Sequence, residues 1–150
     1  MILISHRGNL NGLNPERENS PPYIREAISA GFDVEIDVRF LNDTIWLGHD
    51  EPQYKVSLSF LEEIKDHSWL HCKNFAALSG LVDQDFRVFY HEKEKYTILN
   101  NGLIWAHDIQ LVDEKCIVPL LSLESVLSYD NQNIYGICSD FVQECRNKFE

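Results

Sequence analysis

The stretch DVEIDVRFLNDTIWLGHD, residues 33–50, decides the fold prediction, because it reads as two strands that carry acids and a histidine. Glu35 and Asp37 lie two positions apart in a run of β-branched residues. On a strand, residues i and i+2 point to the same face, so the two carboxylates converge while the apolar residues between them face the other way. Paired carboxylates suit a hard cation. The alternative is a solvent-facing polar stripe of a half-exposed antiparallel strand.

The second half of this stretch adds a histidine to the acids. Asn42-Asp43 predicts a turn, and the apolar run TIWL then leads into Gly48-His49-Asp50. A histidine close to a cation can move protons in a reaction. The stretch therefore predicts a strand pair whose ends carry both metal-ligand and acid–base chemistry.

Strands and helices alternate along the rest of the chain. The predicted strands cover residues 2–6, both sides of the Asn42-Asp43 turn, 69–74, 86–91, 103–108, 116–121 and 135–142; the predicted helices cover the segment between Ser20 and Gly31, then 57–67, 75–82, 122–127 and 143–150. This order predicts a parallel sheet with right-handed crossovers. A closed (β/α)₈ barrel usually takes about 250 residues, and the connections after residue 91 are short. We therefore predict a single α/β domain, residues 1–150, built as a compact, trimmed TIM-type barrel with short or missing helices in its second half.

Composition narrows the class of protein. The formal charge of −11 argues against nucleic acid or an anionic membrane surface as main partner, and no apolar run approaches the length of a membrane span. The N-terminal MILISHRGN reads as a first strand and not as a secretory signal. The cysteines Cys72, Cys116, Cys138 and Cys145 form no CxxC pair, which favours thiols in a reducing compartment and hence the cytoplasm.

Polar motifs recur at the ends of the predicted strands, where a parallel barrel has its active-site face. In chain order they are His6-Arg7-Gly8, Glu18-Asn19-Ser20, Glu35-Ile36-Asp37, His49-Asp50 and Ser139-Asp140. In this order and strand context the sequence resembles the glycerophosphodiester phosphodiesterase family of phospholipase-C-like phosphodiesterases. The match runs over the first 50 residues and recurs more weakly near the C-terminus.

The resemblance implies a role for each matching residue. Glu35 and Asp37 would be ligands of one divalent cation, usually Mg²⁺ or Ca²⁺. His6 and His49 would be the catalytic acid–base pair, and Arg7 would bind the phosphate. Asp50 and Glu18 would support them.

One position departs from the family pattern. His71 occupies the position of the family's third-strand glutamate, and Lys73 occupies the position of the lysine that follows it in the family. Imidazole is a poor calcium ligand and suits softer ions such as Mn²⁺ or Zn²⁺ better. His71 is therefore either a ligand of a different metal or a contact to the substrate. For both His71 and Lys73, a purely structural role is the alternative to a role in the site.

Three further residues lie at the same predicted mouth. His91 would contact substrate and Trp105 would form an apolar wall, with packing as the alternative for both. His107-Asp108 imitates the earlier His-Asp pair but lacks the supporting motifs, so we interpret it as structural.

The predicted function is a metal-dependent phosphoric diester hydrolase that acts on a glycerophosphodiester or a related small diester. A relative that forms a cyclic phosphate would use the same residues. The alternative from another class is a non-catalytic phosphate or phospho-sugar binding module. Because Phe89, Ile104 and Leu121 lie in the poorly covered second half, we also expect a homodimer.

Overall fold

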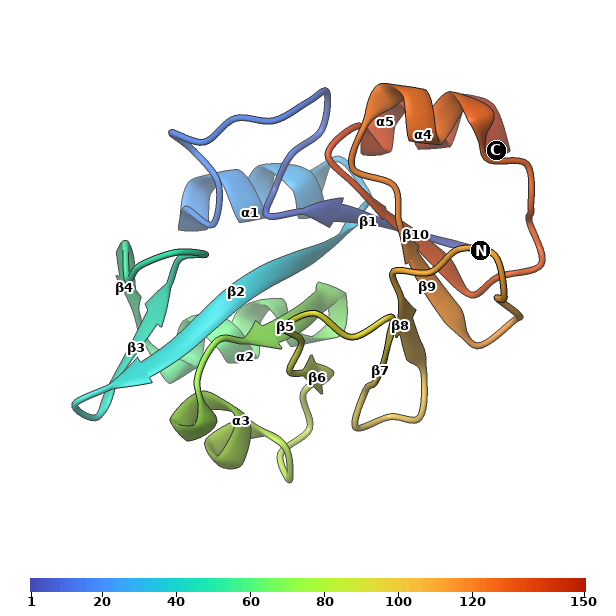
Figure 1. The fold of residues 1–150 in the computed structure, drawn as a ribbon. Coiled ribbons are helices and arrows are strands. Elements are labelled where there is room, and N and C mark those ends of the chain that lie inside the picture. Colours follow the sequence, from blue (N-terminus) through green and yellow to red (C-terminus); the bar gives the residue numbers. More distant parts are fainter.

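The computed structural model describes residues 1–150 as ten strands of one curled sheet with helices packed on its outside (Figure 1). The elements follow one another as β1 (Ile2–His6), α1 (Pro21–Ser29), β2 (Asp33–Leu41), β3 (Thr44–Leu47), β4 (Tyr54–Val56), α2 (Leu58–Ile64), β5 (Ser68–Cys72), α3 (Phe75–Leu81), β6 (Val88–Phe89), β7 (Tyr96–Ile98), β8 (Ile104–Ala106), β9 (Cys116–Pro119), α4 (Leu123–Ser128), β10 (Gly136–Ser139) and α5 (Val142–Phe149). A short 3₁₀ turn, Lys65–His67, joins α2 to β5. The predicted α/β class and the strand-helix alternation are confirmed.

Parallel strands form the curled part of the sheet. β1 pairs with β10 and β2, β2 with β5, β5 with β6, and β8 with β9, which pairs with β10, all in parallel. Their carboxyl ends therefore lie along one edge of the sheet. The antiparallel strands β3, β4 and β7 are additions at the two ends of the sheet path.

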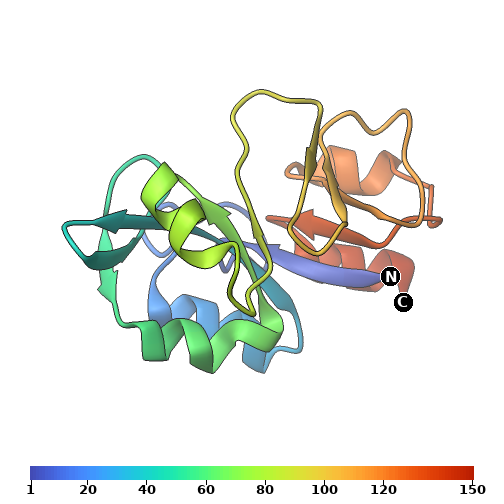
Figure 2. The same cartoon turned by 90° about the horizontal axis from the view of Figure 1, so that it is seen from below.

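The sheet does not close into the TIM-type barrel that the sequence predicted, because β6 and β8 share no hydrogen-bonded ladder. The chain between them forms β7 and irregular segments but no helix, as Figure 2 shows. Asn100 covers the open edge of β6: its backbone N–H donates to the Val88 carbonyl at 3.2 Å, and its side-chain oxygen accepts from the Val88 N–H at 3.0 Å. One residue thus replaces a neighbouring strand. The predicted shortening of the second half is confirmed.

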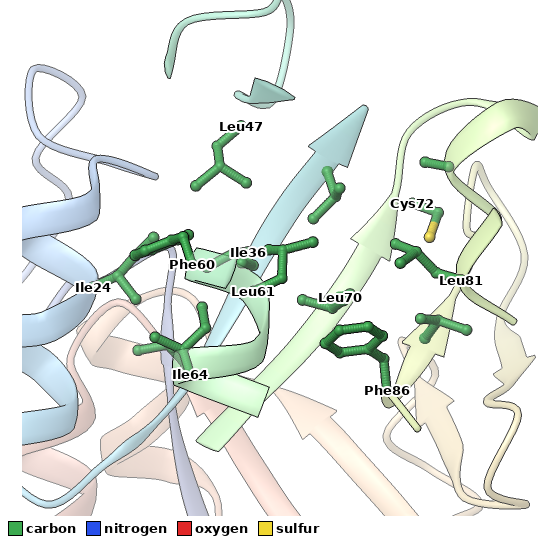
Figure 3. Close-up of a cluster of buried hydrophobic side chains, with 14 of the residues drawn as sticks. Ile24, Ile36, Leu47, Phe60, Leu61, Ile64, Leu70, Cys72, Leu81 and Phe86 are labelled. Atoms are coloured by element: carbon green, nitrogen blue, oxygen red, sulfur yellow. The ribbon is translucent and has the colours of Figure 1, made fainter. Parts of the chain in front are cut away.

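Alternation along the strands separates two kinds of core. Val34, Ile36 and Val38 of β2 face outward into an apolar cluster that α1, α2 and α3 cover. Figure 3 shows Phe60 and Leu61 in this cluster beside Ile36. A second cluster joins α4 and α5 to β1, β9 and β10. A third fills the concave face with seven buried residues: Ile4, Trp69, Phe89, Leu99, Trp105, Ile117 and Cys138. The polar strand ends lie on this concave face, next to that third cluster.

Two local predictions are confirmed by backbone angles. Asn42 and Asp43 have φ values of 48° and 58°, the conformation of a tight turn between antiparallel strands. Gly31 follows α1 with φ of 85°, a left-handed conformation that suits glycine after a helix. β4 and β7, three residues each, were not predicted. None of the helices has the length and apolar character needed to cross a bilayer.

Candidate functional site

A cavity of about 480 Å³ opens at the carboxyl ends of the parallel strands. Its fourteen lining residues include eight of the nine predicted site residues: His6, Arg7, Glu35, His49, His71, Lys73, His91 and Trp105. Sheet register explains the convergence, because His6 on β1 is the neighbour of Glu35 on β2, and Asp37 is the neighbour of His71 on β5. The fold therefore brings together side chains that are far apart in the sequence.

Asp37, the ninth of these residues, is fully buried and is the centre of the polar network. Its Oδ2 accepts from the Asn19 side-chain amide at 2.9 Å and lies 3.0 Å from Arg7 Nε. Its Oδ1 lies 3.2 Å from His71 Nδ1. Burial alone would raise its pKa, but the imidazoles of His49 and His71 and the guanidinium of Arg7 hold that pKa well below its usual range. Its cationic neighbours therefore favour the ionised form of Asp37.

Glu35 is 2% exposed, and its carboxylate faces the cavity. Oε1 lies 3.6 Å from His71 Nδ1, and Oε2 lies 3.8 Å from His6 Nε2. Oε2 has no hydrogen-bond partner. A buried carboxylate oxygen without a partner is costly, so Oε2 is available as a donor atom to a cation.

His6 is held by the far end of the chain. Its Nδ1 lies 2.7 Å from Asp140 Oδ1, and the same oxygen accepts from the Asn9 side chain at 2.7 Å. Burial disfavours the charged imidazole, but the hydrogen bond to Asp140 and the charge of Glu35 outweigh it and raise the pKa of His6. Because Asp140 is a carboxylate acceptor, it fixes the Nδ1–H tautomer and leaves Nε2 facing Glu35 and the cavity.

Arg7 occupies a sharp turn directly after β1. Its φ is 55°, and Gly8 follows with φ of 94°, where an added Cβ would come within 2.8 Å of the Tyr23 ring. Glycine at position 8 is therefore required, and the turn directs Arg7 back over the strand ends. Nη1 donates to Glu18 at 3.2 Å and Nη2 to His49 Nδ1 at 2.7 Å.

His49 comes from the loop after β3 and is the most accessible of the imidazoles around Asp37, with its side chain 38% exposed. Its Nδ1 lies between Arg7 Nη2, at 2.7 Å, and Asp37 Oδ1, at 3.3 Å. The atom can either accept from Arg7 or donate to Asp37, and each choice fixes a different tautomer. Asp50, predicted as a supporting group, is almost fully exposed and lies 3.6 Å from His49 Nε2.

His71 points its two ring nitrogens in different directions. Nδ1 faces the two acids, and Nε2 lies 3.2 Å from the backbone carbonyl oxygen of His91. The ring stacks on Phe89 with centroids 4.8 Å apart and planes 8° from parallel. Burial opposes its charge, but hydrogen bonds to Asp37 and Glu35 outweigh burial and raise the pKa of His71 to about 9.

Glu35, Asp37 and His71 form the candidate metal centre. Each offers one donor atom, and these atoms lie within 4.8 Å of one another. With the unpartnered Glu35 Oε2, the donor set fits a divalent cation. Lys73 lies on the rim of this group, with Nζ 3.9 Å from Asp37 Oδ1.

The opposite wall of the cavity is aromatic. Trp105 is buried and stacks on Phe89 at 4.5 Å, and His91 stacks on His107 at 3.9 Å. These two stacks connect β6 with β8 across the open edge of the sheet. Trp105 and His91 thus both line the cavity and pack against other rings. Their two predicted roles, at the site and in packing, are therefore compatible. His107, interpreted as structural, also lines the cavity.

Three supporting residues were not assigned roles from the sequence. Asn19, at φ of 61°, both donates to the Asp37 carboxylate and accepts the Asp37 backbone N–H at 2.9 Å. Asn9 joins Asp140 to Glu18. Asn19 and Asp140 lie inside the motifs Glu18-Asn19-Ser20 and Ser139-Asp140, which were a signal for them, whereas nothing in the sequence marks Asn9.

The stacked pair His91 and His107 predicts an acid-sensitive stability. Burial of its ring, and then the charges of His91 and His71, lower the pKa of His107 to about 4. The unfolded chain binds this proton below a pKa of about 6.5, so stability is lost as the pH falls from about 6.5 towards 4. His107→Phe keeps a stacked ring without the proton. The unfolding free energy of His107→Phe minus that of the parent, from urea denaturation, should therefore be larger at pH 5 than at pH 7.5. An equal difference at both pH values would contradict the prediction.

The chain matches no protein-family model, no curated protein and no solved structure.

Proposed function

We propose that this protein is a metal-dependent phosphodiesterase that cleaves a glycerophosphodiester or a related small phosphodiester. One observation carries the proposal: a single cavity brings a cation donor set, Glu35, Asp37 and His71, together with two further imidazoles, His6 and His49, and with Arg7. A cation at the donor set would neutralise the charge of the diester and make its phosphorus easier to attack. The curled parallel sheet with its site at the strand carboxyl ends supports descent from a TIM-type barrel of the family that the sequence resembles.

Arg7 binds the phosphate in this proposal. A phosphate oxygen that accepts from the Arg7 guanidinium competes with His49 Nδ1, which accepts from Nη2 at 2.7 Å in its absence. Once released, His49 Nδ1 can donate to Asp37, 3.3 Å away, which leaves Nε2 with a free electron pair. Substrate binding thereby prepares His49 for proton transfer.

His6 is the second proton-transfer group. Asp140 holds its Nδ1–H, so every proton that His6 gains or loses in the reaction is at Nε2, on the cavity side. One imidazole removes the proton of the attacking hydroxyl, and the other gives a proton to the leaving alkoxide, so that the pair ends the reaction with the same total of protons. A binding module would need Arg7 and the cation but neither imidazole.

The alcohol groups of the diester lie against Lys73, His91 and Trp105 in this proposal. Trp105 and Phe89 provide an apolar surface, while Lys73 and His91 provide polar atoms at the rim. This wall accepts a small alcohol such as glycerol.

The test is hydrolysis of bis(p-nitrophenyl) phosphate by the chelator-treated protein after addition of single divalent cations. We expect cation-dependent release of p-nitrophenol that is lost in His6→Gln and retained in His67→Gln, a histidine outside the cavity. Phosphorus NMR of the products from a glycerophosphodiester then separates hydrolysis from cyclic-phosphate formation. Binding of the diester without turnover for any cation would overturn the enzyme proposal in favour of a phosphate-binding module.

A small molecule is the proposed partner of the cavity, and the charge of −11 supports the exclusion of nucleic acid. All four cysteines are free and buried. That state supports a reducing compartment and hence the cytoplasm as the proposed location.

We predict that the chain forms a homodimer through the outer face of β7 and β8. Of the three residues on which the sequence argument rested, Phe89 and Leu121 line the cavity instead, but Ile104 lies on the outer face in a shallow apolar hollow with Leu111, which is 78% exposed. β7, with Ile98 76% exposed, is the edge strand beside it. Exposed apolar edges favour association. Light scattering at micromolar concentration should give twice the chain mass, and Leu111→Glu should give the monomer mass; a monomeric parent contradicts the prediction.

A further inference from the structure

His71 is oriented in the manner of a metal-bound histidine. In proteins, a ligating imidazole almost always donates its second N–H to a carboxylate or a backbone carbonyl, which fixes the ring and its tautomer. His71 Nε2 lies 3.2 Å from the His91 carbonyl oxygen, so Nε2 is the donor and Nδ1 is the atom that faces the carboxylates.

The ring has little freedom to turn away from this orientation. It is 8% exposed and lies flat against Phe89, whose ring is in turn stacked on Trp105. The backbone of His71 belongs to β5, which is paired with β2 on one side and with β6 on the other. The nitrogen donor is therefore positioned before any cation binds.

The protein oxygen donors at this point are few for Ca²⁺. Ca²⁺ takes six to eight oxygen ligands, while the cavity offers two carboxylates at this point. Asp37 already shares its oxygens with Arg7, Asn19 and Lys73. Only Glu35 has an oxygen without a hydrogen-bond partner among the three donors.

We propose that the centre formed by Glu35, Asp37 and His71 selects a transition-metal ion of the zinc type over Mg²⁺ and Ca²⁺, with His71 Nδ1 as the selecting ligand. The inference rests on the metal site of the proposed function and goes beyond it in naming the class of ion. Imidazole favours zinc, iron and nickel, whereas sites for magnesium and calcium are built from oxygen. The ion displaces any proton on His71 Nδ1 to solvent, and the Nε2–H bond to His91 remains.

The test compares cation affinities in the parent and in variants of one residue. Dissociation constants for Zn²⁺, Mn²⁺, Mg²⁺ and Ca²⁺ are measured on the chelator-treated full chain by competition with a chromophoric chelator. Because most sites favour Zn²⁺ over Mg²⁺ to some degree, the deciding quantity is the change in the Zn²⁺/Mg²⁺ affinity ratio. His71→Asn places an amide near the position of Nδ1, and His71→Glu supplies a third carboxylate. His67→Gln is the control, since it removes an exposed imidazole next to a carboxylate outside the cavity.

We expect the ratio to fall at least about tenfold in both His71 variants, the scale on which even indirect changes at metal sites act, and to stay unchanged in His67→Gln. In the parent, nitrogen-15 NMR of histidine should show one Nδ1 signal that shifts with Zn²⁺ while its Nε2 stays protonated. Should His71→Glu fail to fold, His71→Asn decides alone. An unchanged ratio, or a shifted Nε2 in place of Nδ1, overturns the selectivity and leaves the cation site of the proposed function standing. Failure of every cation to bind overturns both.

Discussion

Asp37→Asn is expected to abolish stabilisation by zinc and to cost the metal-free protein about 3 kcal/mol of unfolding free energy. Glu35→Gln should abolish the same stabilisation at a smaller cost. In the parent, zinc at about a hundred times its dissociation constant should add about 2.7 kcal/mol. For a chain of this length that corresponds to a rise of roughly 5–10 °C in melting temperature. The two substitutions thus distinguish Glu35, expected to act mainly as a metal ligand, from Asp37, expected to bind the metal and also to stabilise the fold.

The cost at Asp37 follows from its partners. The side chain is fully buried, and Arg7 and His71 lie 3.0 and 3.2 Å from its oxygens. Asparagine keeps the shape but removes the charge, so both cationic groups lose their closest buried counter-charge. Loss of one partner of a buried ion pair typically costs about 3–5 kcal/mol.

Glu35 has weaker partners than Asp37 in the metal-free protein. Its nearest cationic atoms, on His71 and His6, are 3.6 and 3.8 Å away, and its Oε2 is unpartnered. Because Oε2 has no hydrogen-bond partner and both ion-pair distances are long, Glu35→Gln is expected to lower the unfolding free energy by less than Asp37→Asn does.

Urea denaturation without metal and thermal melts with and without zinc measure the two effects. Asn101→Asp, an exposed change at a turn outside the cavity, serves as the control for an altered charge. A Glu35→Gln protein that still gains the full zinc stabilisation would remove Glu35 from the centre. A loss of metal-free stability as large as that of Asp37→Asn would show that Glu35 is structural.

The fold could be predicted from sequence wherever a local pattern determines it. The period-two pattern of β2 separated Glu35 and Asp37 from Val34, Ile36 and Val38, and the structure places these two sets on opposite faces of the sheet. Helix ends at Ser20 and Gly31 were marked by their residue types. These signals depend only on neighbouring residues, so they predict the local structure whatever the arrangement of the strands.

Closure of the sheet could not be predicted in the same way. Whether β6 meets β8 depends on the path of the chain between residues 89 and 104, and that segment has no strong period. Asn100, which covers the edge of β6, resembles any loop asparagine in sequence. β4 and β7 are three-residue strands, each defined by its pairing with an antiparallel neighbour, β3 or β8.

The candidate site was predicted as a set of residues but not as a network. Eight of the fourteen residues that line the cavity were predicted site residues, because parallel strands bring their carboxyl ends to one edge. The pairing of His6 with Asp140, by contrast, joins residues 134 positions apart through the β1–β10 ladder. The orientation of His71 by the His91 carbonyl is a backbone contact, on which sequence motifs carry no information.

Asp140→Asn tests whether the pairing with His6 serves the reaction. The asparagine amide can donate to His6 Nδ1, which would favour the tautomer with the proton on Nε2 and block proton uptake there. We expect turnover to fall at least about a hundredfold, with little change in the KM of the diester. Loss of the carboxylate also removes a contact that raises the pKa of His6, so the pH–rate limb that belongs to His6 should move to lower pH. A purely structural Asp140 would lower stability without moving that limb.

Replacing His6 or His49 singly is expected to cost at least about a hundredfold in turnover, the usual scale for a lost general acid or base. Both rings line the same cavity, from the end of β1 and from the loop after β3, and Arg7 contacts both His49 and the Asp37 carboxylate. Because they act on one diester in one reaction, the double variant His6→Ala/His49→Ala should be little slower than the worse single variant. The parent should show a bell-shaped dependence of turnover on pH, with one limb lost in each single variant. If His49→Ala retains turnover within a factor of about three of the parent, His49 has no part in proton transfer, and Arg7 holds it only as a neighbour.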